Sequence, residues 1–320
     1  MKKPIRLDEK IFLIDDLDLN VSGRTGSYIL MEEELTIIET CTSHSVPFIL
    51  EGLKEIGRSP EEVKYIIVTH IHLDHSGGAG LLLTYCPEAK IIVHPKGAKH
   101  LADPSKLITG AKAVYKEQFE ELFDPILPIP PDRIITKTHE DTLTIGPECT
   151  LSFFDTPGHA NHHFSIYHPG VNGMFTGDTA GVTYPQLAHL GIDLFLPSTS
   201  PNQFDPEKML QSIELYEQKQ LTSLFFGHYG SSNRLEEVYR QIRYWLPIFV
   251  KEAERIFAQN ALNDNAVELL KESLYSKVTS SLSEVNINSD HEFFKILNLD
   301  LSVSSMGLID YLVKKESDRE

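Results

Sequence analysis

Cysteine is scarce in this sequence, with three among 320 residues: Cys41, Cys86 and Cys149. The three lie far apart and form no C-x-x-C pair, so neither a disulfide scaffold nor a cysteine-based zinc site is expected. Each lies in or beside an apolar run, where a reduced thiol behaves as a small hydrophobic side chain. The sequence therefore predicts three buried thiols with a packing role.

Positive charge is also in short supply. The chain has 29 Lys and Arg against 46 Asp and Glu, which gives a formal charge of -17 at pH 7. Such a surface repels phosphate backbones unless a local basic stripe overrides the mean field. The basic residues here are scattered singly, and the one Trp lies in a predicted helix. The composition therefore argues against a nucleic-acid partner.

Long hydrophobic runs are missing as well. No uninterrupted run approaches the roughly 18 apolar residues that a transmembrane helix needs. Lys2 and Lys3 resemble the start of a signal peptide, but acidic residues interrupt the next stretch before an apolar segment can form. We therefore expect a cytoplasmic protein with no membrane partner.

In the first half, short apolar runs alternate with helical patterns. Residues 27–31 and 35–40 read as the strands of a hairpin whose tip is 32–34. Apolar positions between 46 and 56 recur at helical spacing. Further strands are predicted at 11–14, 65–70 and 90–94. The order of these elements is a β-α-β-like rhythm.

The second half repeats the scheme. Asp205 is a helix cap and Pro206 opens a helix that runs to about Gln220. Strand patterns cover the segments that begin with RIITKT and TLTI, followed by 149–156, 163–168, 173–178, 193–197 and 223–228. Two strand-rich halves, each flanked by helices, predict an α/β protein with an αββα sandwich over residues 1–232.

Two segments lie outside this layout. Residues 96–131 are largely helical, with Tyr115, Phe119 and Phe123 in an i, i+4, i+8 stripe. Ordinary packing of this helix into the core is the favoured interpretation, and a lid-like insertion that lines a substrate pocket is the alternative. Residues 233–320 show no strand pattern and read as three or four helices.

The first of these C-terminal helices, from about Leu235 to Phe257, carries one continuous apolar stripe. Such a stripe either packs on its own domain or contributes to a homodimer. We favour self-packing with some dimer contact.

The strongest local signal is THIHLDHSGG at 69–78, where an apolar strand ends. It places four ligand-type side chains within six positions: His70, His72, Asp74 and His75. A lone His is usually a core or surface residue, but this density is hard to explain by chance. The Gly-Gly pair that follows is expected to let the backbone turn tightly into the next helix.

Three more ligand-type residues follow apolar strands, each directly after a glycine: His159, Asp178 and His228. With the four above, they supply five imidazoles and two carboxylates. This set is large enough for two divalent ions with open positions for water. Zinc is the expected metal, although iron and manganese suit the same ligands.

At this point the residues resemble the metallo-β-lactamase superfamily, in its H-x-H-x-D-H hydrolase branch. The resemblance covers about residues 10–230 and implies the same αββα sandwich. The motifs look most similar to those of glyoxalase II thioesterases and N-acyl homoserine lactonases. The resemblance also implies two metal sites and a bridging ligand: His70, His72 and His159 for the first ion, Asp74, His75 and His228 for the second, and Asp178 between them.

The chain departs from the family pattern in two places. The third motif often reads G-H-T-x-G-H, whereas residues 158–163 read GHANHH. We interpret His162 and His163 as supporting or surface residues and not as metal ligands. The lactonases carry a Tyr three residues after the bridging Asp, where this chain has Gly181. Tyr184 is the nearest phenol.

These residues predict a dinuclear-metal hydrolase that cleaves a carboxylic ester bond, a lactone or small acyl ester, by metal-bound hydroxide. Asp74 and Asp178 would orient the hydroxide or return a proton to the leaving group. Tyr184 and Tyr229 are candidate oxyanion donors, although a Tyr near a rim commonly just packs. The alternatives are a glyoxalase II-like thioesterase, a phosphodiesterase at the same metals, and a non-enzymatic metal-bound scaffold.

Overall fold

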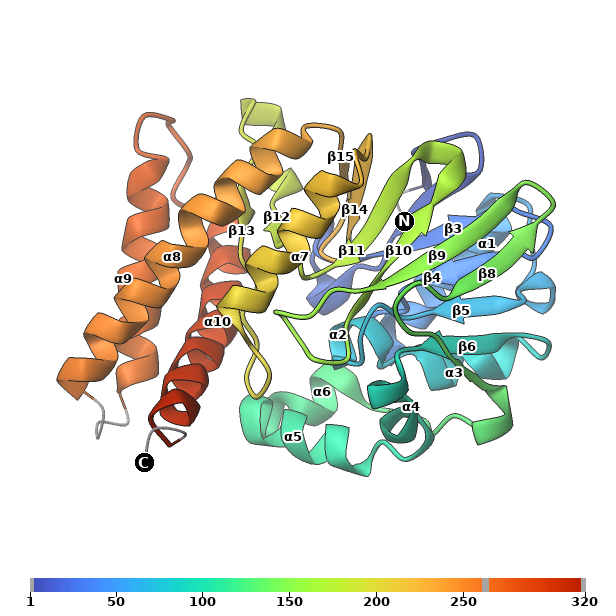
Figure 1. Ribbon diagram of the computed structural model, residues 1–320, viewed down its shortest axis with the longest axis horizontal. Coiled ribbons are helices and arrows are strands. Elements are labelled where there is room, and N and C mark those ends of the chain that lie inside the picture. Colours follow the sequence, from blue (N-terminus) through green and yellow to red (C-terminus); the bar gives the residue numbers. More distant parts are fainter. Residues whose placement is uncertain (1–2, 261–264, 318–320) are drawn as a thin grey trace. The chain divides into compact units, whose positions relative to one another are not determined.

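Figure 1 shows the computed structural model, in which residues 3–260 and 265–317 are described. Contacts divide these residues into two compact units. Unit 1 holds the chain up to Thr156 together with 162–177 and 219–235. Unit 2 holds 157–161, 178–218 and the chain from Glu236 onward. The predicted domain boundary between 232 and 233 stays a prediction.

The first sheet of unit 1 has seven strands in chain order. The pairings from β1 to β4 are antiparallel, and those from β4 to β7 are parallel. The β3–β4 pairing confirms the predicted hairpin. The strands are β1 (Ile5–Arg6), β2 (Ile11–Asp15), β3 (Gly26–Leu30), β4 (Thr36–Ile38), β5 (Tyr65–Ile67), β6 (Lys90–Val93) and β7 (Ile134–Thr136).

The second sheet of unit 1 has six strands in the order β15-β14-β11-β10-β9-β8. Only β11 and β14 pair in parallel, so their carboxyl ends lie at the same edge of the sheet. The strands are β8 (Thr142–Gly146), β9 (Cys149–Asp155), β10 (Phe164–His168), β11 (Gly173–Gly177), β14 (Ser223–Phe226) and β15 (Ser231–Ser232).

The two sheets face each other across a buried apolar core. Leu13, Tyr28 and Ile38 of the first sheet pack in one cluster with Phe153 and Phe175 of the second. A separate cluster joins the opposite face of the first sheet to α1 (Val46–Glu55) and α3 (Ala79–Tyr85). Alternate strand residues point to opposite faces, so one sheet serves both clusters. The predicted sandwich of two mixed sheets flanked by helices is confirmed.

The predicted helical insertion is broken into pieces: α4 (Pro95–Ala102), α5 (Ser105–Tyr115) and α6 (Phe119–Phe123). Lys116, between α5 and α6, has a φ of 49°, a left-handed conformation that ends the α-helix. The aromatic residues of the predicted stripe still contact one another, since the Tyr115 and Phe123 ring centroids are 4.8 Å apart. Phe119 and Phe123 are buried against Leu73, which supports ordinary packing of the insertion.

Unit 2 contains α7 (Pro206–Gln218) and a two-stranded sheet of β12 (Val182–Thr183) and β13 (Phe195–Leu196). The cap of α7 is confirmed, because the Asp205 carboxylate accepts hydrogen bonds from the backbone N–H groups of Glu207 and Lys208, both at 3.1 Å. The sequence did not predict β12, because a strand of two residues is too short to show a periodic pattern.

Three C-terminal helices follow: α8 (Leu235–Asn260), α9 (Ala266–Ser281) and α10 (Glu292–Ser317). Two of the predicted helical stretches merge into α10. Among the described residues, α10 is also the one helix long and apolar enough to cross a membrane, with 44% of its most apolar window buried. Sequence analysis did not single it out because Asn298, Asp300 and several serines interrupt its apolar run. Its buried residues, which include Leu297 and Leu308, and its packing on α9 are those of a core helix.

Candidate metal centre

The first group of ligand-type residues leaves the first sheet at the end of β5. His70 follows this strand directly, where the apolar side chains have ended. His72 has an extended backbone and caps the one-turn helix α2 (Leu73–Ser76). Asp74 and His75 lie within that turn, so four chemically suited side chains leave one short segment.

The Gly-Gly pair after this segment acts differently from the prediction. Gly77 and Gly78 have ordinary helical φ values of -59° and -80°, so no tight turn requires them. A Cβ on Gly78 would lie 2.7 Å from the backbone oxygens of both Thr40 and Thr42. Glycine is therefore needed for the close approach of two backbone segments, which holds the ligand loop against the end of β4.

Asp74, His75 and His228 form a group within unit 1. Their ligand atoms all lie within 4.8 Å of one another. Asp74 Oδ2 is 3.6 Å from His228 Nε2 and 3.9 Å from His75 Nε2. Both imidazoles are buried, whereas the Asp74 side chain is 23% exposed. One carboxylate between two imidazole nitrogens is a donor set that suits a divalent transition metal.

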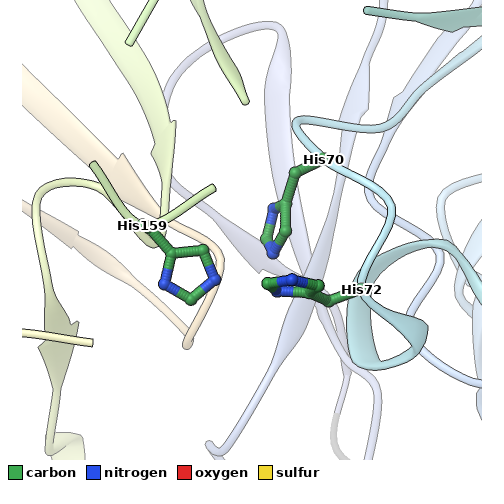
Figure 2. A group of neighbouring side chains, drawn as sticks. All are labelled: His70, His72 and His159. Carbon is green, nitrogen blue, oxygen red and sulfur yellow. The ribbon is translucent and has the colours of Figure 1, made fainter. Parts of the chain in front are cut away.

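His70 and His72 lie beside this group. Their ring centroids are 4.6 Å apart, and the centroids of His70 and His75 are 4.2 Å apart. Figure 2 shows the imidazoles of His70 and His72, which come from the loop after β5, and that of His159, which comes from the loop after β9.

The ends of β11 and β14 lie side by side in unit 1. The backbone N–H of Gly227 donates to Gly177 O at 3.1 Å. In the sequence, Asp178 directly follows Gly177 and His228 directly follows Gly227.

Gly177 makes this edge tight. Its φ is 47°, a region that glycine adopts at little cost. A Cβ there would lie 2.5 Å from Thr69 Oγ1. The backbone N–H of Phe164 also donates to Thr69 O at 3.0 Å, so the β9–β10 loop returns to the end of β5. Gly177 thus does more than end a strand.

Within unit 2, His159 and Asp178 lie together. His159 Nε2 is 3.6 Å from Asp178 Oδ2, and both side chains are buried. Ser198 contacts both residues: its carbonyl accepts from His159 Nδ1 at 2.9 Å, and its hydroxyl donates to Asp178 Oδ2 at 3.1 Å.

Three of the imidazoles have their Nδ1 atoms held by neighbouring oxygens. His70 Nδ1 is 3.0 Å from Thr69 Oγ1, and His75 Nδ1 is 3.3 Å from Glu39 Oε2. His159 Nδ1 is likewise held by Ser198 O. The Nε2 atom of His75 then faces Asp74, and that of His159 faces Asp178. Metal-binding histidines are generally held in this manner. The residues present therefore fit a metal centre.

Glu39 is a functional candidate that sequence analysis missed. Its side chain is buried at the end of β4, and Oε1 accepts a hydrogen bond from the Thr69 backbone at 3.0 Å while Oε2 faces His75. Its only sequence signal is a charged residue at the end of the apolar run LTII. Its φ of 68° is an uncommon conformation for a residue with a side chain.

Comparison with known proteins agrees with this geometry. The family model of the metallo-beta-lactamase superfamily matches residues 22–228, well over half of the chain. The chain belongs to the metallo-beta-lactamase superfamily. Its His and Asp residues form a candidate metal site.

Superfamily members of described activity are distant relatives. An N-acyl homoserine lactonase of Rhizobium radiobacter is 25% identical over 181 residues, which are 56% of this chain and 63% of the lactonase. An N-acyl homoserine lactonase of Bacillus thuringiensis is 28% identical over 183 residues, 56% of this chain and 61% of that protein. The chain thus matches less than two thirds of the length of either lactonase.

A solved superfamily structure resembles the chain over most of its length. The protein ST1585 from Sulfolobus tokodaii has a TM-score of 0.65 and 20% identity, covering 94% of this chain and 98% of the other. This likeness shows that the fold is shared.

The two tyrosines predicted as oxyanion donors are both buried. Tyr184 is 2% exposed, and its ring meets Phe293 edge-on at 5.2 Å. Tyr229 packs in the core between the two sheets, and burial, with the charges of Asp15 and Asp16, raises its pKa. The contacts of both rings are those of packing residues, and their catalytic role stays a prediction.

A second group of ligand-type residues, Glu32, Cys149 and His168, lies elsewhere in unit 1. Burial raises the pKa of the Cys149 thiol to about 11, which disfavours the thiolate that binds metals. Lys10 Nζ also pairs with Glu32 Oε2 at 2.8 Å. The group is a packed polar cluster. All three cysteines are free and buried, as predicted.

Replacement of Glu39 by Gln is expected to weaken metal binding by the Asp74–His75–His228 group by about 10–100-fold, because loss of an orienting carboxylate lowers metal affinity by that factor. Competition with a chromophoric chelator measures the affinity. Glu33→Gln, which changes an exposed carboxylate of the β3–β4 turn, is the matched control. Equal affinities in the two variants would contradict an orienting role for Glu39.

Proposed function

We propose that this superfamily member hydrolyses a carboxylic ester bond, in a lactone or small acyl ester, with two divalent metal ions. The observation that carries the proposal is the group of Asp74, His75 and His228, with His70 and His72 beside it. The distant similarity to N-acyl homoserine lactonases supports the ester class.

In this proposal the ligands divide as the family resemblance implies. His70, His72 and His159 would hold one ion, Asp74, His75 and His228 would hold the other, and Asp178 would bridge them. Imidazole and carboxylate ligands suit zinc best and also accept iron or manganese. The cluster of Glu32, Cys149 and His168 takes no part.

When bound, such a pair of ions supplies an acidified water and a Lewis acid for the substrate carbonyl. The water oxygen adds to the carbonyl carbon, the bond to the leaving oxygen breaks, and one water proton ends on that oxygen. Asp74 is suited to carry this proton, because its side chain is 23% exposed while His75 and His228 are buried.

An apolar wall beside the metal-binding loop supports a neutral acyl substrate. Leu73, which lies between His72 and Asp74, packs in one cluster with Phe119 and Phe123. Its buried residues only pack, whereas the partly buried Leu107, Ile108 and Tyr115 extend the cluster and keep some apolar surface exposed. The formal charge of -17 disfavours substrates with several negative charges.

A homologous series of acyl lactones tests the substrate class. Because each buried methylene contributes at most about 0.8 kcal/mol, kcat/KM is expected to rise by up to about fourfold per methylene until the apolar surface is filled. The measurement compares this series with S-lactoylglutathione and bis(p-nitrophenyl) phosphate at one metal loading.

A clear preference for the glutathione thioester would replace this proposal by the thioesterase alternative, and a preference for the phosphate diester would replace it by the phosphodiesterase. Independence from acyl length would refute the apolar recognition. Ile108→Ala removes part of the partly buried apolar surface and should flatten the chain-length dependence, whereas Tyr85→Ala, at a surface position 49% exposed, should not.

A further inference from the structure

The segment 198–202 of unit 2 contacts both ligand-type residues of that unit. Besides the two hydrogen bonds of Ser198 to His159 and Asp178, the Ser200 hydroxyl donates to His159 O at 2.9 Å. The imidazole and backbone of His159 and the carboxylate of Asp178 are therefore held by two residues, Ser198 and Ser200.

The C-terminal helix α10 also forms hydrogen bonds with this segment. Thr199 Oγ1 donates to Ser304 O at 2.7 Å, and the Asn202 backbone N–H donates to Asp310 Oδ2 at 2.9 Å. Lys314 Nζ donates to Asn202 O at 2.8 Å. Three positions spaced along α10 thus bind three backbone or side-chain groups of one short segment.

Gly307 lets the helix come this close. A Cβ at this position would lie 2.6 Å from Thr199 O and 2.7 Å from the carbonyl carbon of Ser200, both backbone atoms. At such distances either α10 or the segment would have to move, because backbone atoms cannot shift as easily as the end of a flexible side chain. The close spacing between α10 and the segment therefore depends on the absence of a side chain at Gly307.

We infer that segment 198–202, held by α10, is a positioning element for the metal ligands His159 and Asp178, so that the C-terminal helix tunes metal affinity. The inference rests on the proposed metal binding by these two residues. Ser198 O accepts the Nδ1 proton of His159, which leaves Nε2 as the ligand atom, and the Ser198 hydroxyl fixes one oxygen of Asp178. Such contacts orient ligands and tune affinity without touching the metal.

Two variants of the full chain test this inference. Ser198→Ala removes the donor to Asp178 and should lower the affinity for the second equivalent of Zn²⁺ by about 10–100-fold, and Ser198→Thr should restore it. Gly307→Ala should lower metal affinity although Ala is the better helix former. Gly110→Ala, in α5 with open space around the site of the added Cβ, is the matched control.

The readouts are chelator competition and the absorption spectrum of the Co²⁺-loaded protein, which reports ligand geometry independently of turnover. A changed cobalt spectrum and weaker binding in Ser198→Ala and Gly307→Ala, with unchanged behaviour in Gly110→Ala, support the inference. Wild-type affinity and spectrum in both variants overturn it. If Gly307→Ala fails to fold, Asp310→Asn, which weakens the hold on Asn202, takes its place.

Because no ester is used, failure of this inference is distinguishable from failure of the proposed function. A chain that binds two ions but cleaves no ester refutes the ester proposal only. Unchanged metal binding in the Ser198 and α10 variants of an active esterase refutes the positioning role only.

Discussion

Asp178→Ala is expected to lower the metal content from about two equivalents to one or fewer and to reduce kcat on the best ester by about a thousandfold. Loss of the proposed bridging carboxylate would remove a ligand from both ions. A thousandfold loss of kcat corresponds to about 4 kcal/mol of transition-state stabilisation. The Asp178 side chain is buried and lies 3.6 Å from His159 Nε2, so Ala at this position removes the carboxylate from beside the imidazole.

Metal analysis of freshly purified protein and kinetics at fixed metal loading measure both effects. Asp132→Ala, which removes an exposed carboxylate, is the control. A variant of Asp178 with unchanged stoichiometry and activity would exclude the bridging role and would leave the other six ligand-type residues to be explained as a mononuclear site or two separate ones.

Removal of the chain after Ser232 is expected to give an insoluble product. The buried apolar residues of α8 alone include Val238, Ile242, Trp245, Leu246 and Phe249. Each contributes about 1.5–3 kcal/mol when buried, so their sum rivals the whole net stability of a domain, about 5–15 kcal/mol. Gly181 shows how closely this helix packs: a Cβ there would lie 2.5 Å from the Ile242 side chain.

Solubility and light scattering of the shortened chain test this expectation. A paired point substitution gives a finer comparison: Phe249→Ser changes a buried position, whereas Tyr244→Ser changes one that is 55% exposed. Phe249→Ser should destabilise strongly and Tyr244→Ser should not. Unaltered solubility and oligomeric state of the shortened chain would refute both self-packing and a dimer contact for α8.

Local sequence carried most of the information on the αββα core. Strand residues alternate or run apolar because the sheets bury one or both faces, and the caps and glycines between them are local chemistry. Sequence also identified the seven ligand-type residues, because five imidazoles and two carboxylates at strand ends are a dense and chemically selective pattern. The hairpin at β3–β4 and the Asp205 cap of α7 were predicted from local sequence alone.

Features formed by residues far apart in the chain were invisible at that level. Glu39 faces His75 across 36 positions, and Ser198 reaches Asp178 across 20, with no periodicity to signal either contact. Glycine is required at position 78 because the backbone oxygens of Thr40 and Thr42 lie too close for a Cβ, and only tertiary packing brings these segments together.

The grouping of 178–218 with the C-terminal helices has the same origin. A helix pattern records which face is apolar, but not which segment covers that face. The sequence therefore supplied the ligand chemistry and the layers, whereas folding chose the supporting partners, because hydrogen bonds between distant segments depend on geometry that no local pattern encodes.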